Sequence, residues 1–314
     1  MWLCALLWWL PVGCQSNPPA NPPPQPTTRL QPHLGTLVSI TVYATPAQAQ
    51  PAIDAAFNEI RAVDKLLSIH RDDSDLAKAN RGEPVSPELQ SVLQKALAIA
   101  KQTEGAFDPT IRPLAKLWGF IQKEQYRIPL PEELRPVLAK VDHRKVTLAG
   151  DQLRFATNGM SIDSGGFGKG YAVDRAIESL QQHGIRIAMV KAGGDMRVLG
   201  LPPGHDHWPV WIEDPRKRGN RTPVKLYSGA LSTSGNYENF FEFEGIRYGH
   251  LLDPRTGQPV PSLGSCTAWA RTCLESDAYA TAAFILGPKR SQQLLPKSVS
   301  LKYIRYRKTG RVIE

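Results

Sequence analysis

The sequence is short of cysteine, and this limits how the chain can be held together. Its 314 residues include four cysteines, and two of these, Cys4 and Cys14, lie at the very start. The other pair, Cys266 and Cys273, falls on one predicted strand and its exit. Extended backbone there would hold the two Cα atoms too far apart for a disulfide. We therefore expect two separate packed thiols.

A long apolar run is also missing from the N-terminus. The first ten residues, MWLCALLWWL, are far shorter than the roughly 20 residues of a membrane-spanning helix, but their length is typical of a signal peptide. Residues 11–14, PVGC, resemble the lipobox of bacterial lipoproteins, in which the cysteine is lipidated and becomes the first residue of the mature chain. We interpret residues 1–13 as a lipoprotein-type signal peptide. A plain secretory signal and a buried apolar strand are the alternatives.

The segment after Cys14 has almost nothing with which to build a core. Residues 15–28, QSNPPANPPPQPTT, are polar and rich in proline, which is typical of an extended tether. The prediction is a lipidated Cys14 with a tether over residues 14–28, followed by one globular domain over residues 29–314. Such a protein would be anchored in the membrane of the bacterial cell envelope and would face the periplasm or the cell exterior.

Acidic residues are fewer than basic ones, which points to anionic partners. The net charge is +9 and the isoelectric point is about 9.4. The basic residues are scattered, with local concentrations only at residues 216–221 and 302–311. Neither stretch carries the interleaved aromatic residues or the fold motif of a nucleic-acid module, so we expect no nucleic-acid partner. A phosphorylated small molecule remains among the anionic partners that fit.

The apolar periodicity of residues 29–314 predicts both helices and strands, in no regular alternation. Helical spacing occurs over residues 47–67, from Ser86-Pro87 onward, after the glycines of 165–170 and over 276–286, where Gly287-Pro288 ends the pattern. Strand patterns occur at 33–43, 186–191, 210–213, 229–232, 239–243, 266–271 and 301–306. An irregular order of this kind favours an α+β fold over a doubly wound sheet. No internal repeat or linker divides the domain.

One glycine-rich turn could hold a phosphate, although it fits neither of the two common phosphate-binding motifs. Residues 161–174, SIDSGGFGKGYAVD, place four glycines and Lys169 before a predicted helix. A P-loop needs glycine at position 163 and serine or threonine at position 170, where this chain has Asp163 and Gly170. The dinucleotide fingerprint fails as well, because the glycines have the spacing G-x-G-x-G. The turn alone could equally be structural.

Further motifs suggest a site with a metal ion and a base. AGGD at 192–195 and TSG at 233–235 each end a strand, and YGHLLDPRTGQPV at 248–260 contains His250, whose residue type titrates near neutral pH. Asp277 and Thr281 are four residues apart, so their oxygens share one face of a helix's first turn and suit Mg²⁺. A helix-capping aspartate and a threonine bonded back to its own helix are the alternatives.

In this order the motifs resemble the ApbE family of FAD:protein FMN transferases. The resemblance also covers HLGT near residue 34, LLSIHRDDSDLAKAN at 66–80 and TEGAFDPTIRPLAKLWGF at 103–120, and it extends over residues 33–287. It implies a fold related to the T-fold, in a single catalytic domain with mixed or antiparallel sheets and packed helices. It also implies a Mg²⁺-dependent enzyme that cleaves the pyrophosphate of its substrate FAD. The FMN half would pass to a Thr or Ser hydroxyl of an exported acceptor protein with a flavinylation motif, with release of AMP.

The resemblance also implies roles for particular residues. His250 would be the catalytic base, and the metal would be held by the backbone carbonyl of Gly166 and the side chains of Asp277 and Thr281. The positions implied to contact FAD are Leu34, His70, Ala106, Phe107, Asp108, Asp163, Lys169 and Leu252. The chain departs from the family pattern at three places, with His70 for a common Tyr, Leu34 for a usual Met and Ala280 where some members have a carboxylate.

Two other functions are compatible with the same motifs. A hydrolase would use water in place of the acceptor hydroxyl and would release FMN and AMP from FAD. A binding lipoprotein would store FAD without turnover, although Asp277, Thr281 and His250 argue against it. Since SGAL at 228–231 only partly resembles the family's acceptor motif, we expect any protein modification to occur in trans.

Overall fold

A computed structural model describes residues 25–121, 125–215, 219–237, 239–260, 263–306 and 312–313 of the chain. The predicted signal peptide, Cys14 and most of the tether lie outside the described residues. The first strand begins at Pro26, three residues before the predicted boundary at residue 29. In the described part of the chain, no helix is both long and apolar enough to cross a membrane.

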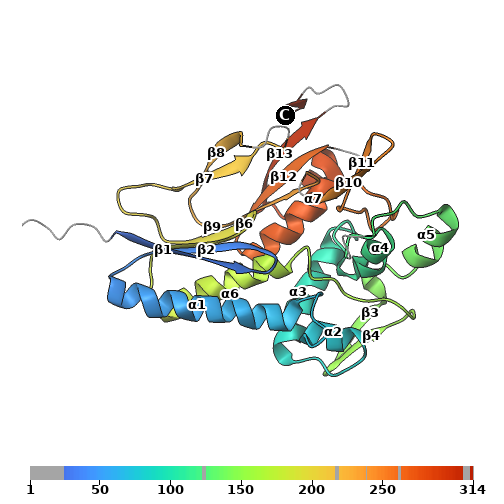
Figure 1. Cartoon of the computed structure of the whole chain (residues 1–314), viewed down its shortest axis with the longest axis horizontal. Helices are drawn as coiled ribbons and strands as arrows, with labels where there is room; N and C mark the ends of the chain where they lie inside the picture. Colours follow the sequence, from blue (N-terminus) through green and yellow to red (C-terminus); the bar gives the residue numbers. More distant parts are fainter. Residues whose placement is uncertain are drawn as a thin grey trace, which may run out of the picture.

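The centre of the fold is an eight-stranded sheet in which every strand pair is antiparallel (Figure 1). From one edge to the other its strands are β1 (Pro26–His33), β2 (Thr36–Tyr43), β5 (Ala188–Ala192), β6 (Asp195–Leu199), β9 (Gly229–Gly235), β12 (Leu263–Ala270), β13 (Ser300–Tyr306) and β14 (Val312–Ile313). Three separate hairpins complete the strands: β3 (Val146–Ala149) with β4 (Gln152–Phe155), β7 (Trp208–Glu213) with β8 (Arg221–Leu226), and β10 (Phe240–Phe243) with β11 (Ile246–Gly249). The predicted α+β class and antiparallel sheets are confirmed.

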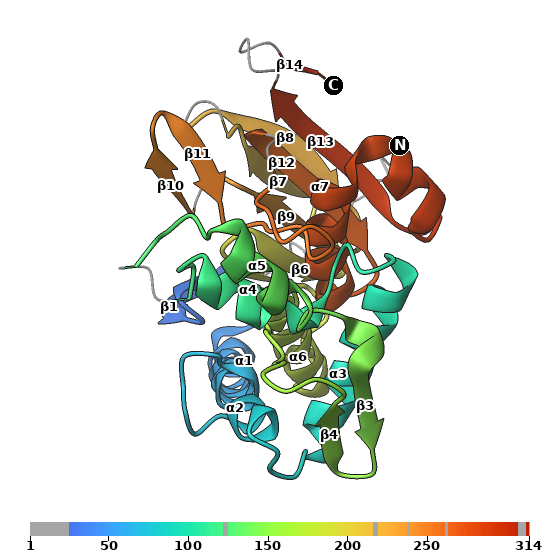
Figure 2. The ribbon, with the colours of Figure 1, turned by 90° about the vertical axis from the view of Figure 1, so that its right-hand side faces the viewer.

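Three long helices cover one face of the sheet, and the β7–β8 hairpin packs on the other (Figures 1 and 2). These helices are α1 (Pro46–Leu67), α6 (Gly168–Gln182) and α7 (Cys273–Leu294). The other helices lie beyond them: α2 (Asp75–Asn80), α3 (Pro87–Gln102), α4 (Arg112–Leu117), α5 (Pro131–Leu138) and two 3₁₀ turns, Pro109–Ile111 and His143–Lys145. The apolar residues of α1 and α6 recur at helical spacing, so they share one face of each helix, and this face packs against β2 and β5.

Two predicted elements have different limits in the structure. The single strand predicted over 33–43 is the end of β1, a turn at Leu34-Gly35 and then β2, because both turn residues have positive φ (53° and 69°) and reverse the chain. The helix predicted over 276–286 begins at Cys273, after the N-cap Thr272. At Gly287 the backbone leaves the helical conformation (φ 74°, ψ 169°), as the sequence predicts, and after this kink a second helical stretch continues to Leu294.

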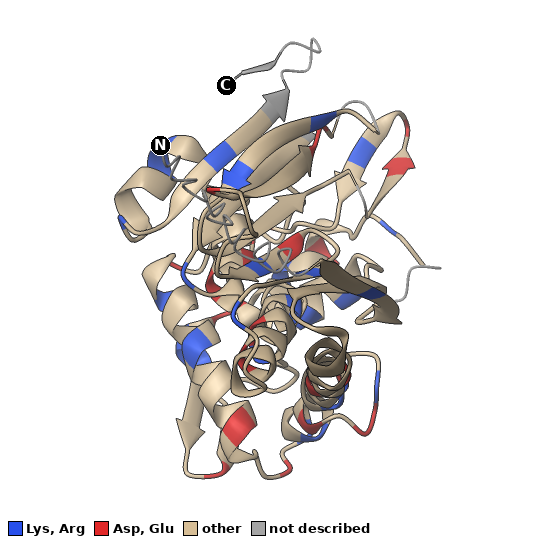
Figure 3. Cartoon of the chain, turned by 90° about the vertical axis from the view of Figure 1, so that its left-hand side faces the viewer, with Lys and Arg blue, Asp and Glu red and all other residues tan. Residues whose placement is uncertain are grey.

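Cys266 and Cys273 are both buried and are not joined to each other by a disulfide, as the sequence predicts. Cys266 lies on β12, and Cys273 is the first residue of α7. Basic and acidic residues are interspersed along the ribbon in Figure 3, in keeping with the scattered charges of the sequence.

The first turns of α6 and α7 contact each other so closely that the contact requires a glycine on α6 and a buried carboxylate one helical turn further along. A Cβ added at Gly170 would lie 2.3 Å from the carbonyl oxygen of Cys273, so only glycine allows this approach. One helical turn further, buried Asp174 accepts hydrogen bonds from the backbone N–H groups of Cys273 (2.8 Å) and Leu274 (2.9 Å), and from Arg197 (2.7 Å). The carboxylate therefore caps α7 from a neighbouring helix and fixes the two helices together.

We expect Asp174→Ala to lower the free energy of unfolding by about 3 kcal/mol, because it leaves buried donors of α7 and Arg197 without their acceptor. Urea unfolding followed by circular dichroism measures the loss. The matched control is Asp54→Ala, which removes an exposed carboxylate paired with Arg29 and should cost less than about 1 kcal/mol. Equal losses in the two variants would contradict the capping role of Asp174.

Candidate active site

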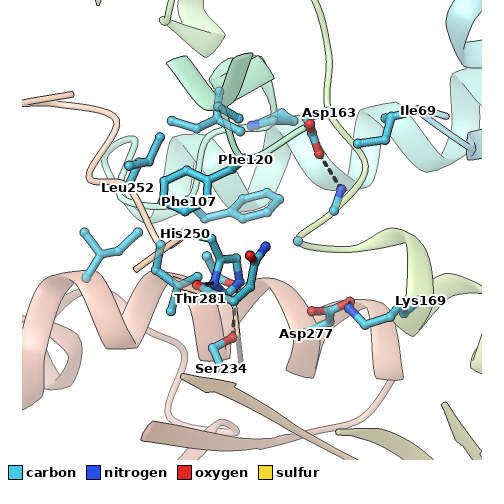
Figure 4. A pocket seen from close by; sticks show the side chains of 18 of the residues that line it. Ile69, Phe107, Phe120, Asp163, Lys169, Ser234, His250, Leu252, Asp277 and Thr281 are labelled. Atoms are coloured by element: carbon cyan, nitrogen blue, oxygen red, sulfur yellow. Dashed lines mark hydrogen bonds and ion pairs between the residues drawn. The ribbon is translucent and has the colours of Figure 1, made fainter. Parts of the chain in front are cut away.

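The structure brings all twelve sequence-predicted site residues to the wall of one cavity of about 460 Å³ (Figure 4). Six segments contribute these residues. They are the turn between β1 and β2, the loop after α1, the loop before the first 3₁₀ turn, the glycine turn with the start of α6, the segment after β11, and α7. The residues are Leu34, His70, Ala106, Phe107, Asp108, Asp163, Gly166, Lys169, His250, Leu252, Asp277 and Thr281. A cavity of this size with a few converging polar groups is typical of a ligand site.

The glycine turn is held at its start by Asn80 and Asp163. The Asn80 side chain pairs with both backbone groups of Ile162, donating to its carbonyl (3.0 Å) and accepting from its N–H (2.7 Å). Asp163 accepts a hydrogen bond from the N–H of Gly165 (2.7 Å), and its own N–H donates to Pro109 (2.7 Å). Burial raises the pKa of the Asp163 carboxyl. These bonds fix the backbone that lines the cavity just before α6 begins.

A cluster of two buried carboxylates and one partly buried lysine lies where α6 meets β6 and α7. The Lys169 ammonium is 3.2 Å from a carboxylate oxygen of Asp195 and 3.8 Å from one of Asp277, toward which it points in Figure 4. The two carboxylates raise the pKa of Lys169, which keeps it charged. Burial raises the pKa of Asp277 to about 7, with a further contribution from Asp195. With all three groups ionised, the cluster has one excess negative charge and favours an added cation.

The oxygen atoms near this cluster suit a hard divalent cation. Asp277 and Thr281 both face the cavity from α7, as their spacing predicts, although they lie in the second and third turns of that helix and not in the first. The Thr281 hydroxyl lies 3.1 Å from that of Ser234. A Cβ added at Gly166 would lie 3.7 Å from the Thr281 oxygen, so the Gly166 backbone also approaches it. Carboxylate, hydroxyl and carbonyl oxygens are the ligands that Mg²⁺ accepts, and the residues present fit this ion.

His250 follows β11 on another wall of the cavity. Its ring Nδ1 lies 3.1 Å from the carbonyl oxygen of Asn239, which also accepts the backbone N–H of His250 (3.0 Å). Since a carbonyl can only accept, Nδ1 carries the proton in the neutral ring and Nε2 carries the basic lone pair. The ring of Phe120 packs edge-on against the imidazole, with 6.4 Å between ring centres.

The remaining wall combines apolar groups with the Asp108 carboxylate, which is hydrogen-bonded within the protein. Phe107 is buried and packs edge-to-face against Phe167 (6.3 Å). Asp108 accepts four hydrogen bonds, two from Thr110 (2.9 and 2.6 Å) and two from His143 (2.8 and 2.9 Å). The Asp108 carboxylate is therefore already bonded to Thr110 and His143, and a ligand that contacts it would have to share its oxygens with these two residues. His70 is exposed, and it lines the cavity where the loop after α1 reaches the surface.

Sequence reasoning missed several residues that complete the site. Asp195 is the carboxylate of the AGGD motif, and its signal was a charged residue after a glycine turn at a strand start. Asn239, Phe120 and Ser234 also line the cavity. Ser234 belongs to the TSG motif and Phe120 to the matched segment 103–120, but the sequence assigns none of the three a role, because their partners lie in other segments of the chain.

A cavity that gathers a partly buried lysine, two carboxylates and an oriented histidine beside the starts of two helices belongs to the class of sites in which enzymes bind and react phosphorylated ligands. The comparison with known proteins makes this more specific. The family model of the ApbE family matches residues 34–304, and the chain belongs to this family.

The relatives and solved structures agree with this membership. The FAD:protein FMN transferase of Treponema pallidum is 33% identical over 83% of this chain and 79% of its own length, and that of Salmonella typhimurium is 31% identical over 93% and 88%. The crystal structure of the ApbE protein from Thermotoga maritima superposes with a TM-score of 0.84 at 31% identity, over 92% of this chain and 96% of that one.

Proposed function

We propose that this protein transfers the FMN half of FAD to a Ser or Thr hydroxyl of an acceptor protein and releases AMP. One observation carries the proposal: the charged cluster of Lys169, Asp195 and Asp277 and the oriented imidazole of His250 line the same cavity. The names of the relatives support the same activity.

In this proposal the chain binds FAD through complementary parts of the cavity. Lys169 supplies a positive charge for the diphosphate, next to the backbone of the glycine turn at the start of α6. Phe107, Leu34 and Leu252 supply apolar surface for the flavin and adenine rings. His70 would present a smaller ring face than the Tyr that the family commonly has at this position.

Gly166, Asp277 and Thr281 would hold Mg²⁺, with the remaining ligand positions left for phosphate oxygens. The bound ion would supply charge neutralisation for the diphosphate and for the departing AMP. Asp195 is not needed as a direct ligand, because its carboxylate is paired with Lys169 and contributes to the negative potential of the site.

The transfer step itself needs a base. The acceptor hydroxyl oxygen forms a new bond to the FMN-side phosphorus while the bond from that phosphorus to the bridging oxygen breaks, and the bridging oxygen leaves with AMP. Nε2 of His250 takes the hydroxyl proton, because the bond from Nδ1 to Asn239 holds the tautomer that leaves Nε2 basic. The nucleophile comes from another protein, so a hydrolase that uses water instead is the second candidate.

The experiment that tests the proposal supplies an acceptor. The mature domain is incubated with FAD, Mg²⁺ and a protein that carries an Asp-x-x-Ser/Thr-Gly-Ala-Thr sequence, and the acceptor is examined for in-gel flavin fluorescence. We expect covalent FMN on the acceptor and none on a variant without the hydroxyl. Free FMN and AMP, formed at the same rate with and without acceptor, would contradict the transferase and favour the hydrolase.

We also propose that the protein is anchored at the bacterial membrane surface through a lipidated Cys14, on the basis of the apolar run and PVGC sequence that precede the tether. Mass spectrometry of the membrane fraction should find a diacylglyceryl group on Cys14. The Cys14→Ser variant should lose this group and leave the membrane fraction. An unmodified mature N-terminus at Gln15 or later would contradict the anchor.

A further inference from the structure

We propose that Tyr126 is a positioning residue for the reaction, which holds the imidazole of His250 in place through Asn239. The inference rests on the proposed role of His250 as the base. Tyr126 itself does not line the cavity, whereas Asn239 and His250 do, so any effect of Tyr126 on the reaction must pass through other residues.

The contacts form one continuous chain. The Tyr126 hydroxyl donates a hydrogen bond to the side-chain oxygen of Asn239 (3.1 Å). The backbone carbonyl of Asn239 then accepts from Nδ1 of His250 (3.1 Å) and from the backbone N–H of His250 (3.0 Å). Two hydrogen bonds of the histidine therefore depend on the position of a single carbonyl, and the side chain of the same residue is held by Tyr126.

Asn239 needs such a hold because it lies just outside the β10–β11 ladder. The last ladder pair on this side is Phe240 with Gly249, so Asn239 and His250 face each other at the open end of the hairpin. This hairpin is a separate two-stranded sheet, distinct from the main sheet (Figure 2). An isolated hairpin is weakly stabilised by its own ladder, so side-chain contacts at its end decide how firmly the Asn239 carbonyl is held.

A stack of aromatic rings fixes the Tyr126 ring from which the hydroxyl projects. Tyr126 stacks on Phe241 (5.2 Å between ring centres, 17° between planes), Phe241 on Tyr248 (5.2 Å, 14°) and Tyr248 on Trp118 (6.0 Å, 30°). Buried Trp118 anchors the far end of the stack, because its indole N–H donates to the carbonyl of Gly257 (2.8 Å). The rings thus hold the hairpin from one side, and the Tyr126 hydroxyl adds a hydrogen bond to the side chain of Asn239.

The test removes the hydroxyl and keeps the ring. We expect Tyr126→Phe to lower kcat for FMN transfer about fivefold, the usual effect of one lost hydrogen bond, and to leave KM for FAD unchanged because Tyr126 does not contact the cavity. The matched control is Tyr171→Phe, which removes a hydroxyl bonded to Glu88 (2.9 Å) between α6 and α3. A kcat for Tyr126→Phe equal to that of the control would overturn the inference.

The decisive measurement is the coupling between the two residues. In the His250→Ala background there is no imidazole left to position, so adding Tyr126→Phe should leave the residual transfer rate unchanged. A further fivefold loss in that background would mean that Tyr126 acts on the fold in general and would overturn the inference. If His250→Ala alone leaves the rate unchanged, the proposed base is wrong and the inference fails with it. A large loss for His250→Ala without any effect of Tyr126→Phe overturns the inference alone.

Discussion

Replacing Asp277 with alanine is expected to lower FAD turnover about a thousandfold or more while the domain stays folded. The carboxylate is the one charged side chain among the proposed metal ligands, and a metal ion contributes several kcal/mol to reactions of this kind. Stability should fall by less than about 2 kcal/mol, because the lost hydrogen bond from the Gly170 N–H (3.2 Å) is offset by relief of burial beside Asp195, which disfavours the ionised form of Asp277 and raises its pKa to about 7. Chromatography of FMN and AMP measures turnover, and urea unfolding measures stability.

Metal removal and a control variant separate the metal site from other effects of the substitution. EDTA should reduce wild-type turnover to the level of Asp277→Ala, and excess Mg²⁺ should restore the wild type but not the variant. Asp54→Ala, which removes an exposed carboxylate on α1, should behave as the wild type in both assays. Turnover that survives both Asp277→Ala and EDTA would show that the metal assignment is wrong.

The sequence predicts which residues line the site better than it predicts where the helices and strands begin and end. Asp163, Lys169, His250 and Asp277 each lie in a short segment with its own local signal, such as a glycine turn, a Pro-Gly turn or a pair of oxygens at helical spacing. Such segments fall at the ends of strands and helices, where an α+β fold can bring them together, and the structure places all of them at one cavity. The family resemblance supplies what the local signals lack, namely that these segments belong to one site.

Properties that depend on contacts between distant residues cannot be read from the sequence. The alternation of residues 33–43 continues through Leu34-Gly35, so periodicity alone conceals the turn between β1 and β2. Gly287 and Pro288 are common helix stops, and the backbone at Gly287 is non-helical, but a second helical stretch follows the kink, in which Ser291 bonds back to the Gly287 carbonyl (2.8 Å). The pairing of Lys169 with Asp195, across 26 positions of sequence, likewise depends on how α6 lies on the sheet.

Replacing His250 with alanine is expected to reduce FMN transfer to an acceptor protein between about a hundredfold and ten-thousandfold, the range that general-base catalysis contributes. FAD binding should persist, because Lys169, Phe107 and the glycine turn lie on other walls of the cavity. In-gel flavin fluorescence follows the transfer, and a titration of FAD fluorescence follows binding. His205→Ala, in an exposed loop, is the matched control and should transfer FMN as the wild type does.

The same variant distinguishes the two candidate reactions. A transferase has to admit a protein hydroxyl to the diphosphate and disfavour water, so acceptor protein should raise wild-type FAD cleavage, and His250→Ala should remove that increase. A hydrolase needs only a water molecule within reach of the same imidazole, so acceptor would leave its rate unchanged, and His250→Ala would reduce cleavage equally with and without acceptor. If the acceptor is labelled equally by wild type and by His250→Ala, the transfer does not use this histidine as its base. The hydrogen bond from Nδ1 to Asn239 would then serve to hold the end of the β10–β11 hairpin and not to prepare Nε2 for proton transfer.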